Sequence, residues 1–283
     1  MAPRVEKLQA EIEELFAEGT LSTAAAERAR QVLDEFLPAL THGEVRAAEK
    51  QKGRWRVNVW VKQGILLGFR LGQLEDMSGE GPLSFVDKST FPVRKFTVED
   101  KVRVVPGGSS VRSGAYLAPG VICMPPMYVN AGAYVDEGTL IDSHALVGSC
   151  AQVGKRVHLS AAAQIGGVLE PVNASPVIIE DDVLVGGNCG VYEGTWVLQG
   201  AVLGAGTILT RATPVYDLVR EQVYRSSANT PLTIPENAVV VPGSRAIGKG
   251  KAAEWGLSLY TPVIVKYRDE KTQTSIELED LLR

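Results

Sequence analysis

The chain has 283 residues, of which 45% are hydrophobic and 22% charged, and its formal net charge is −4 at pH 7. This length fits one large domain or two to three small ones, and the interspersed, slightly acidic charge argues against nucleic-acid binding. No apolar run approaches the ~20 residues that a membrane span needs and no secretory signal opens the chain, so we expect a cytoplasmic protein without a membrane partner. The three cysteines fit buried apolar positions in a reducing compartment better than a disulfide or a zinc set.

Residues 1–100 are predicted to form a small α/β domain. Residues 4–18 place apolar side chains along one face of a helix that Gly19 ends. Ser22 or Thr23 can cap a second helix that runs to about Leu40, and residues 44–60 are typical of a β-hairpin that turns at Gly53. A third amphipathic helix is expected over residues 61–74. Its inward-facing residues would be Ile65, Leu66, Phe69 and Leu71.

We expect these helices to cover the first coil of the repeat that follows, because the end of a solenoid exposes unpaired strand edges.

From residue 111 the sequence repeats every six residues, a period that neither a helix nor an alternating strand produces. Fifteen of the sixteen repeat positions are Val, Leu or Ile, and one is Cys. They are Val111, Leu117, Cys123, Val129, Val135, Ile141, Val147, Val153, Leu159, Ile165, Ile179, Val185, Val191, Val197, Leu203 and Leu209.

A second set of positions keeps the same phase. The fourth residue after each aliphatic position is mostly small, and the third is often glycine, as at Gly114, Gly132 and Gly194. A branched side chain would fill the core of each coil, the small residue would fit a corner, and glycine permits the turn. The pattern predicts a mainly β fold, a left-handed parallel β-helix over residues 101–242, with three hexapeptides in each triangular coil and roughly five coils.

The repeat has one break and one end. Between Ile165 and Ile179 lie two residues more than two repeats, so a bulged loop is expected to project near residues 171–176. After Pro214 the pattern dissolves, and a turn at 235–237 with a strand over 238–241 suggests a last repeat-like strand. Residues 243–283 are predicted to form a C-terminal β cap. It would comprise a flexible basic loop at 243–251, a strand over 258–269 and a short closing helix from 275.

Three kinds of protein fit a coil of this type. Most are coenzyme A-dependent acyltransferases that work as trimers, because flat prism faces pack side by side and leave long grooves for an extended pantetheine arm. A second kind binds zinc through three histidines at a subunit interface. Of His42, His144 and His158 only the last two lie on the repeat, so no metal site is expected. A third kind is a non-catalytic scaffold.

The run YVNAGAYVDEGTLIDSHALVGSCAQVGKRVHLSAAAQIGGVLEP (128–171) closely resembles the tetrahydrodipicolinate N-succinyltransferase family. Residues 46–50 and the segments KVRVVP (101–106), VRSGAYLAPG (111–120), PVIIEDD (176–182) and SLYTPVIVK (258–266) resemble it as well. The resemblance implies succinyl transfer from succinyl-CoA to the amine of ring-opened, hydrated tetrahydrodipicolinate, in lysine and diaminopimelate biosynthesis. It also implies a homotrimer, small-molecule substrates only, and succinyl-CoA as co-substrate with no tightly bound cofactor.

The resemblance assigns two acceptor-binding residues. Arg103 matches the arginine of the family's RVVP segment and would clamp a carboxylate of the acceptor, although a structural salt bridge would also explain it. Asp142 matches the family's catalytic aspartate, and because it follows the inward-facing Ile141 its carboxylate should point outward. It could then hold the amine and take its proton. An aspartate at this repeat position can equally well be a turn-bonding residue, as we expect for Asp136.

The chain departs from the family at one position. Relatives carry a second glutamate in the segment that reads GGNCGVYEG here (186–194), and the count from the IIED motif places Gly190 there. Glu193, three residues on, is the nearest carboxylate. His144, two residues from Asp142, is an alternative base because an imidazole titrates near neutrality.

For the donor, three cations in the C-terminal region could meet the nucleotide phosphates of coenzyme A, although a plain solvated loop explains them as well. They are Arg245, Lys249 and Lys251. The sequence does not distinguish succinyl from acetyl donors, since no residue for the extra carboxylate stands out. An acetyl-CoA-dependent N-acetyltransferase on the same or a related amine is therefore the alternative enzyme, and a scaffold the alternative outside enzymes.

Overall fold

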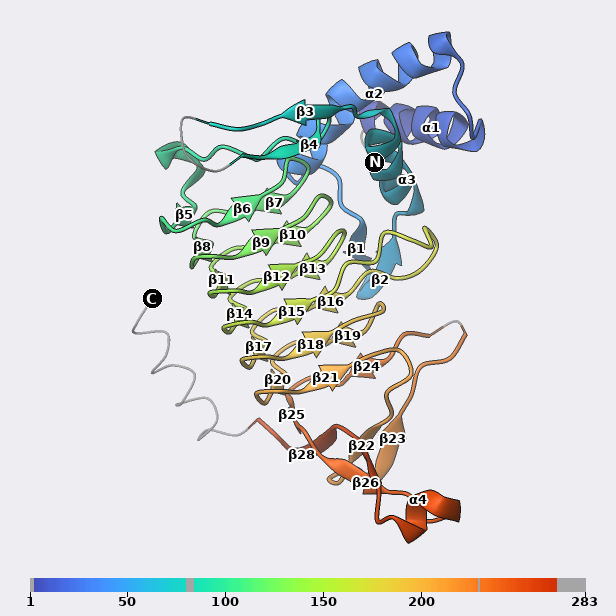
Figure 1. Ribbon diagram of the computed structural model, residues 1–283, viewed down its shortest axis with the longest axis vertical. Coiled ribbons are helices and arrows are strands. Elements are labelled where there is room, and N and C mark those ends of the chain that lie inside the picture. The colour runs from blue at the N-terminus through green and yellow to red at the C-terminus, as the bar shows by residue number, and fades with distance from the viewer. Residues whose placement is uncertain (1–2, 80–83, 229, 269–283) are drawn as a thin grey trace.

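The computed structural model describes residues 3–79, 84–228 and 230–268. Its centre is a stack of coils built from two-residue strands, which runs from the green to the orange part of the chain in Figure 1. Three parallel sheets extend along the stack, and the chain visits them in turn, one strand in each. All sixteen repeat positions, fifteen aliphatic residues and Cys123, lie at the second residue of a strand and are at most 2% exposed. The sequence periodicity therefore predicted both the strands and the core.

The first sheet contains β6 (Ser110–Val111), β9 (Tyr128–Val129), β12 (Leu146–Val147), β15 (Gln164–Ile165), β18 (Gly190–Val191) and β21 (Ile208–Leu209). The second contains β7 (Tyr116–Leu117), β10 (Tyr134–Val135), β13 (Gln152–Val153), β16 (Ile178–Ile179), β19 (Trp196–Val197) and β24 (Thr233–Ile234). The third begins with β5 (Arg103–Val104), β8 (Ile122–Cys123), β11 (Leu140–Ile141), β14 (His158–Leu159), β17 (Leu184–Val185) and β20 (Val202–Leu203). The turns between these sheets form three corners of the coil. The first corner joins the first sheet to the second, the second corner joins the second sheet to the third, and the third corner joins the third sheet back to the first.

The N-terminal part folds much as the sequence predicts. Helices α1 (Pro3–Ala17) and α2 (Thr23–Thr41) are joined by a turn, and the hydroxyl of Ser22 accepts a hydrogen bond from the Ala25 amide (3.2 Å) to cap α2. Strands β1 (Ala48–Gln51) and β2 (Arg54–Val57) form the expected hairpin. Helix α3 (Val59–Leu71) begins two residues earlier than expected. Its buried face contains Leu67, whereas Leu66 and Phe69 are only half-buried.

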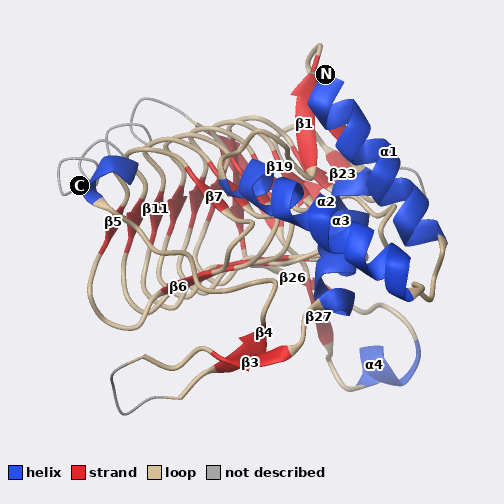
Figure 2. Ribbon diagram, turned by 90° about the horizontal axis from the view of Figure 1, so that it is seen from above, coloured by secondary structure: helices blue, strands red, loops and turns tan. Residues whose placement is uncertain are grey.

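The helices do not sit across the end of the first coil as expected. They pack along the first corner over several coils, on one side of the stack in Figure 2. The corner residues Ala131 and Cys150 belong to the same buried cluster as Ile65 of α3. Because these two corner positions are apolar and buried, the corner itself offers the helices a hydrophobic surface.

Polar contacts fix this domain to the coil. The carboxylate of Glu180, which is 7% exposed, accepts hydrogen bonds from Lys50 Nζ (2.8 Å) and Trp55 Nε1 (2.7 Å). Lys62 is fully buried in α3 and donates from Nζ to the carbonyl of Ala174 (2.6 Å). Burial lowers the pKa of the Lys62 ammonium group. The N-terminal domain thus holds residues 166–177, the loop that the break in the repeat predicted.

Between the helices and the coil lie β3 (Leu74–Asp76), β4 (Val86–Lys88) and the short helix η1 (Val98–Asp100). Strands β3 and β4 pair in an antiparallel hairpin that Figure 2 shows outside the coil. After β21 the chain leaves the first corner for β22 (Val215–Asp217) and β23 (Gln222–Tyr224), then returns in β24 and β25 (Ala238–Val241). Three additions therefore meet at the first corner: the N-terminal helices, the 166–177 loop and the 210–232 excursion.

The C-terminal region differs from expectation in two places. Residues 243–251 are not a flexible loop, since they contain β26 (Ser244–Ala246) and the start of α4 (Gly250–Glu254). The strand expected over 258–269 is interrupted at Thr261 and Pro262, which separate β27 (Ser258–Tyr260) from β28 (Val263–Tyr267). Proline lacks a backbone donor and interrupts the strand. The first half, β27, pairs with β26, and the second half, β28, pairs with β22 and β25. The helix expected from residue 275 lies outside the described residues.

Candidate active site

Asp142 lies at the third corner, immediately after the buried Ile141. It is half-buried, and its Oδ1 accepts a hydrogen bond from the amide of Ser143 (2.6 Å). Asp136 makes the equivalent bond to the Glu137 amide (2.8 Å) at the second corner, so the turn contact alone does not set Asp142 apart. Within the described residues the Oδ2 atom of Asp142 has no hydrogen-bond partner. This oxygen is available to a ligand.

His144 lies at the same corner. Its backbone adopts φ +62°, its amide donates to the Pro126 carbonyl (2.5 Å), and the residue is exposed. The turn therefore carries an imidazole and a carboxylate two residues apart, as the sequence predicts.

Small residues follow Asp142 down the third corner. The equivalent positions in the next three coils are Ser160, Gly186 and Gly204. Their amides continue the ladder of backbone hydrogen bonds that the Asp142 amide begins. The other corner residues there are also small or short. They are Ala161, Ala162, Gly187, Asn188, Ala205 and Gly206. With strands ~4.8 Å apart, this strip extends about 14 Å from Asp142 without a bulky side chain.

Arg103 lies on the sheet that leads to Asp142. It is exposed in β5, paired with Ile122, which in turn pairs with Leu140. Two strand spacings, about 10 Å, therefore separate Arg103 from the strand before Asp142. Its side chain makes no ion pair within the described part of the chain, so the salt-bridge explanation lacks a partner there.

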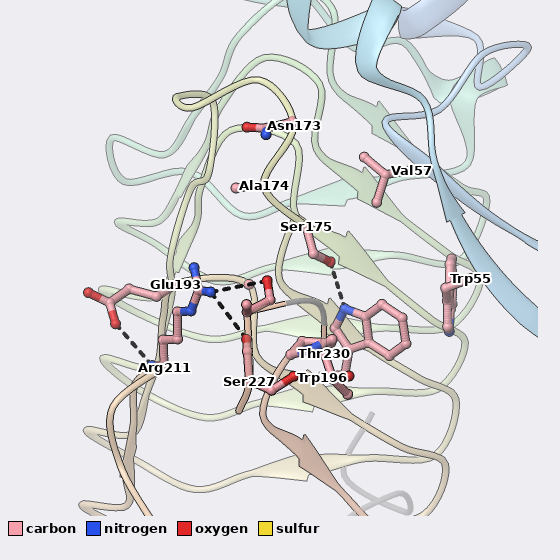
Figure 3. Close-up of a pocket in the computed structure, with 13 residues that line it drawn as sticks. Trp55, Val57, Asn173, Ala174, Ser175, Glu193, Trp196, Arg211, Ser227 and Thr230 are labelled. Atoms are coloured by element: carbon pink, nitrogen blue, oxygen red, sulfur yellow. Dashed lines mark hydrogen bonds between the residues drawn. The ribbon is translucent and has the colours of Figure 1, made fainter. Parts of the chain in front are cut away.

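Glu193 lies elsewhere, at the first corner and two coils further along. Its Oε2 accepts a hydrogen bond from the backbone amide of Arg211 (2.9 Å), as Figure 3 shows. Gly190 occupies the outward position of β18 on the first sheet. One chain therefore does not bring Glu193 together with Asp142 and His144.

A cavity of about 440 Å³ opens at the first corner beside Glu193. Figure 3 shows Arg211 in it, with Nη2 donating to the carbonyls of Ser227 (3.2 Å) and Ala228 (3.4 Å), and Trp196 Nε1 donating to Ser175 Oγ (2.8 Å). A second cavity of about 900 Å³ shares Arg211. Its lining residues include Gly166, Glu170, Tyr192, Glu193 and Arg211. The sequence analysis missed Tyr192 and Arg211 because the cavity forms from segments that the repeat does not relate.

The C-terminal cations lie at the far end of the coil. Arg245 is exposed in β26, and Lys249 is exposed just before α4. Lys251 forms an ion pair with Glu254 (2.5 Å) one turn along α4. Arg245 and Lys249 are therefore the cations more available to a phosphate.

All three cysteines are buried and free. Burial raises the pKa of the Cys123 and Cys150 thiols to about 12 and raises that of Cys189, so none is a ready nucleophile. In the described ranges no group of three or more His, Cys, Asp or Glu side chains is placed to hold a metal ion. Nor is any described helix long and apolar enough to cross a bilayer.

The sixfold coil makes this chain a hexapeptide-repeat protein, and the comparisons show that its class is an acyltransferase. Residues 176–211 match the model for the hexapeptide repeat of succinyl-transferase, and residues 7–71 match that for the N-terminal domain of tetrahydrodipicolinate N-succinyltransferase. The 2,3,4,5-tetrahydropyridine-2,6-dicarboxylate N-succinyltransferase of Azoarcus sp. (strain BH72) is 46% identical over 99% of both chains. That of Acinetobacter baylyi is 41% identical over 90% of this chain and 89% of the relative.

The chain belongs to the tetrahydrodipicolinate N-succinyltransferase family. Among solved structures, a putative 2,3,4,5-tetrahydropyridine-2-carboxylate N-succinyltransferase from Campylobacter jejuni matches 87% of this chain and 64% of its own. The match has a TM-score of 0.45 at 16% identity.

Proposed function

We propose that this protein transfers the succinyl group of succinyl-CoA to the amine of ring-opened, hydrated tetrahydrodipicolinate, in cytoplasmic lysine and diaminopimelate biosynthesis. The observation that carries the proposal is the 46% identity, over nearly the whole of both chains, to a relative named for this activity. The product would be N-succinyl-2-amino-6-oxopimelate. Retention on immobilised coenzyme A, released by free coenzyme A, is the first test, because a scaffold would flow through.

The third corner supplies groups for this reaction. An amine attacks a thioester only as the neutral base, so a proton must leave the ammonium group as the N–C bond forms and the C–S bond breaks. The free Oδ2 of Asp142 can accept that proton, and His144 follows two residues later in the same turn. The coenzyme A thiolate leaves and is protonated. The strip of small residues below Asp142 would accept the extended pantetheine arm, with Arg245 and Lys249 near the nucleotide phosphates and Lys251 contributing less.

The proposal includes finer features of the architecture. The coil would be left-handed, as sixfold repeats of this composition indicate. It would have three domains: an N-terminal α/β domain over residues 1–100, the β-helix over residues 101–242 and a C-terminal β cap over residues 243–283.

We also propose a homotrimer with its active site between prisms. Asp142 and Glu193 lie at different corners of one chain, so a site that uses residues from both corners requires two subunits. Sedimentation is expected to give a trimer that carries the activity. An active monomer would refute the shared site.

Arg103→Ala is expected to raise the acceptor KM roughly ten- to a hundredfold and to leave affinity for coenzyme A unchanged. The physical reason is the loss of a charge-assisted contact to a carboxylate, which contributes about 1.5–3 kcal/mol. Steady-state kinetics with each substrate varied in turn measures this. An unchanged acceptor KM in a folded variant would return Arg103 to a structural role.

A further inference from the structure

A cavity of about 390 Å³ lies over the second sheet, next to the β1–β2 hairpin. The outward residues Gln152 and Ile178 of this sheet are fully buried, whereas the next two, Trp196 and Thr233, are half-buried and line the cavity. In Figure 1 the hairpin lies beside β13 and β16, and β19 and β24 follow below it. The N-terminal domain therefore stops covering the second sheet after β16, and the cavity opens there. Its volume is within the ~300–1,000 Å³ that is usual for small-molecule sites.

Two tryptophan rings form apolar walls of this cavity. Trp55 Nε1 donates to the carboxylate of Glu180 (2.7 Å), and Trp196 Nε1 donates to Ser175 Oγ (2.8 Å), a bond that Figure 3 shows. Both indole donors are thus already used, so the rings offer a ligand only their carbon surface. Leu198 adds a third apolar side chain. These walls suit an apolar or aromatic group.

Four charged side chains line the cavity as well, and two of them are already paired. Lys50 Nζ lies 2.8 Å from Glu180 Oε1, and Glu180 Oε2 accepts a hydrogen bond from the Gln199 amide (3.2 Å). The other two, Arg54 and Glu236, are exposed, and within the described part of the chain neither side chain has a hydrogen-bond or ion-pair partner. Arg54 belongs to β2 and Glu236 to the turn between β24 and β25. The cavity therefore has one free cation and one free acid, from two different parts of the fold.

This lining suits a neutral zwitterion. Its two cations and two acids cancel, so a ligand that carries both charges keeps the cavity neutral, whereas a ligand with one charge does not. Arg54 can donate to a carboxylate and Glu236 can accept from an ammonium group. An α-amino acid with a large apolar side chain combines both charges with a group for the tryptophan walls.

We propose that this cavity binds a free α-amino acid with a large apolar side chain. Arg54 would contact its carboxylate, Glu236 its ammonium group, and the rings of Trp55 and Trp196 its side chain. The site is independent of the proposed acyl transfer, in which Arg54 and Glu236 take no part.

Calorimetry of the full-length protein with L-phenylalanine tests the proposal, because this probe carries both charges and an aromatic ring. Three smaller probes each lack one of these features. The ammonium group is missing from 3-phenylpropanoate, the carboxylate from 2-phenylethylamine and the ring from L-alanine. Each is expected to bind the wild type at least about threefold more weakly than L-phenylalanine. Absence of saturable L-phenylalanine binding would overturn the site.

Two variants test the charged contacts. Arg54→Met is expected to weaken L-phenylalanine binding about 3- to 10-fold, the effect of one exposed charge-assisted contact, and not to weaken binding of 2-phenylethylamine, which has no carboxylate. Glu236→Gln is expected to weaken L-phenylalanine binding by a similar factor and not to weaken binding of 3-phenylpropanoate, which has no ammonium group. No loss for L-phenylalanine, or an equal loss for every probe, would overturn the role given to that residue.

Matched controls change the same groups outside the cavity. Arg56→Met, two residues along β2, and Glu221→Gln are expected to bind L-phenylalanine like the wild type. Tryptophan fluorescence locates the ligand, since Trp196→Phe should reduce the change on binding, whereas Trp255→Phe, which removes a 70% exposed ring elsewhere, should keep it. A fluorescence change that disappears in Trp255→Phe would place the ligand outside this cavity and refute the proposal.

Discussion

Asp142→Asn is expected to lower kcat for succinyl transfer at least about a hundredfold. The substitution keeps the size of the side chain and its turn contact to the Ser143 amide. It removes the negative charge that would hold the acceptor's ammonium group and the oxygen that would take its proton. Stopped or continuous thiol-release kinetics with saturating substrates measures the effect, and retention on immobilised coenzyme A shows that the donor site is intact.

Asp136→Asn is the matched control. Asp136 makes the same turn contact one repeat earlier but at the second corner, so its replacement is expected to leave kcat within about twofold. Near wild-type turnover by a folded Asp142→Asn variant would show that the assignment of Asp142 is wrong. The proton acceptor would then be sought at His144.

Gly148→Ala is expected to destabilise the coil by about 3 kcal/mol or more, the upper end of the usual cost of overpacking. A Cβ at residue 148 would lie 2.1 Å from the amide nitrogen of Gly167 and 2.6 Å from its Cα. Both are backbone atoms of the next coil, so relief requires the coils to separate. Thermal unfolding should show Tm lowered by roughly 6–12 °C.

Gly138→Ala is the control that separates the cost of the close contact from the cost of an unfavourable backbone conformation. Gly138 has φ +69°, and the nearest atom to a Cβ there is Arg156 Cγ at 3.6 Å. Its replacement is expected to cost only the ~1–2 kcal/mol of a left-handed non-glycine residue. Equal losses of stability in the two variants would contradict the close stacking at Gly148.

The coil was predictable from sequence because each hexapeptide contains the same local pattern of residue types. An inward aliphatic residue such as Ile141 and a small corner residue such as Ala145 recur locally, and neighbouring coils reinforce the same register. The position of the N-terminal helices was not predictable in this way. It depends on a buried cluster that includes Ile65, Ala131 and Cys150 and so joins segments far apart in the sequence.

The site was predictable in part. Asp142 and His144 share a turn because they are two residues apart. The separation of Glu193 from them also follows from the repeat. Positions share a sheet only at intervals of three, and Ile141 is the sixth position whereas Val191 is the thirteenth, so the two lie on different sheets. The cavity with Tyr192 and Arg211 had no such signal. The cavity forms only where the 166–177 loop and the 210–232 excursion come together at the corner between them in the folded chain.

Thiol release from succinyl-CoA and from acetyl-CoA, measured with ring-opened tetrahydrodipicolinate as acceptor, tests the account most directly. We expect acceptor-dependent release with succinyl-CoA, at least tenfold faster in kcat/KM than with acetyl-CoA, and a product heavier than the acceptor by one succinyl group. Preference for acetyl-CoA would make the protein an N-acetyltransferase. Absence of acceptor-dependent release with either donor would contradict the enzyme assignment.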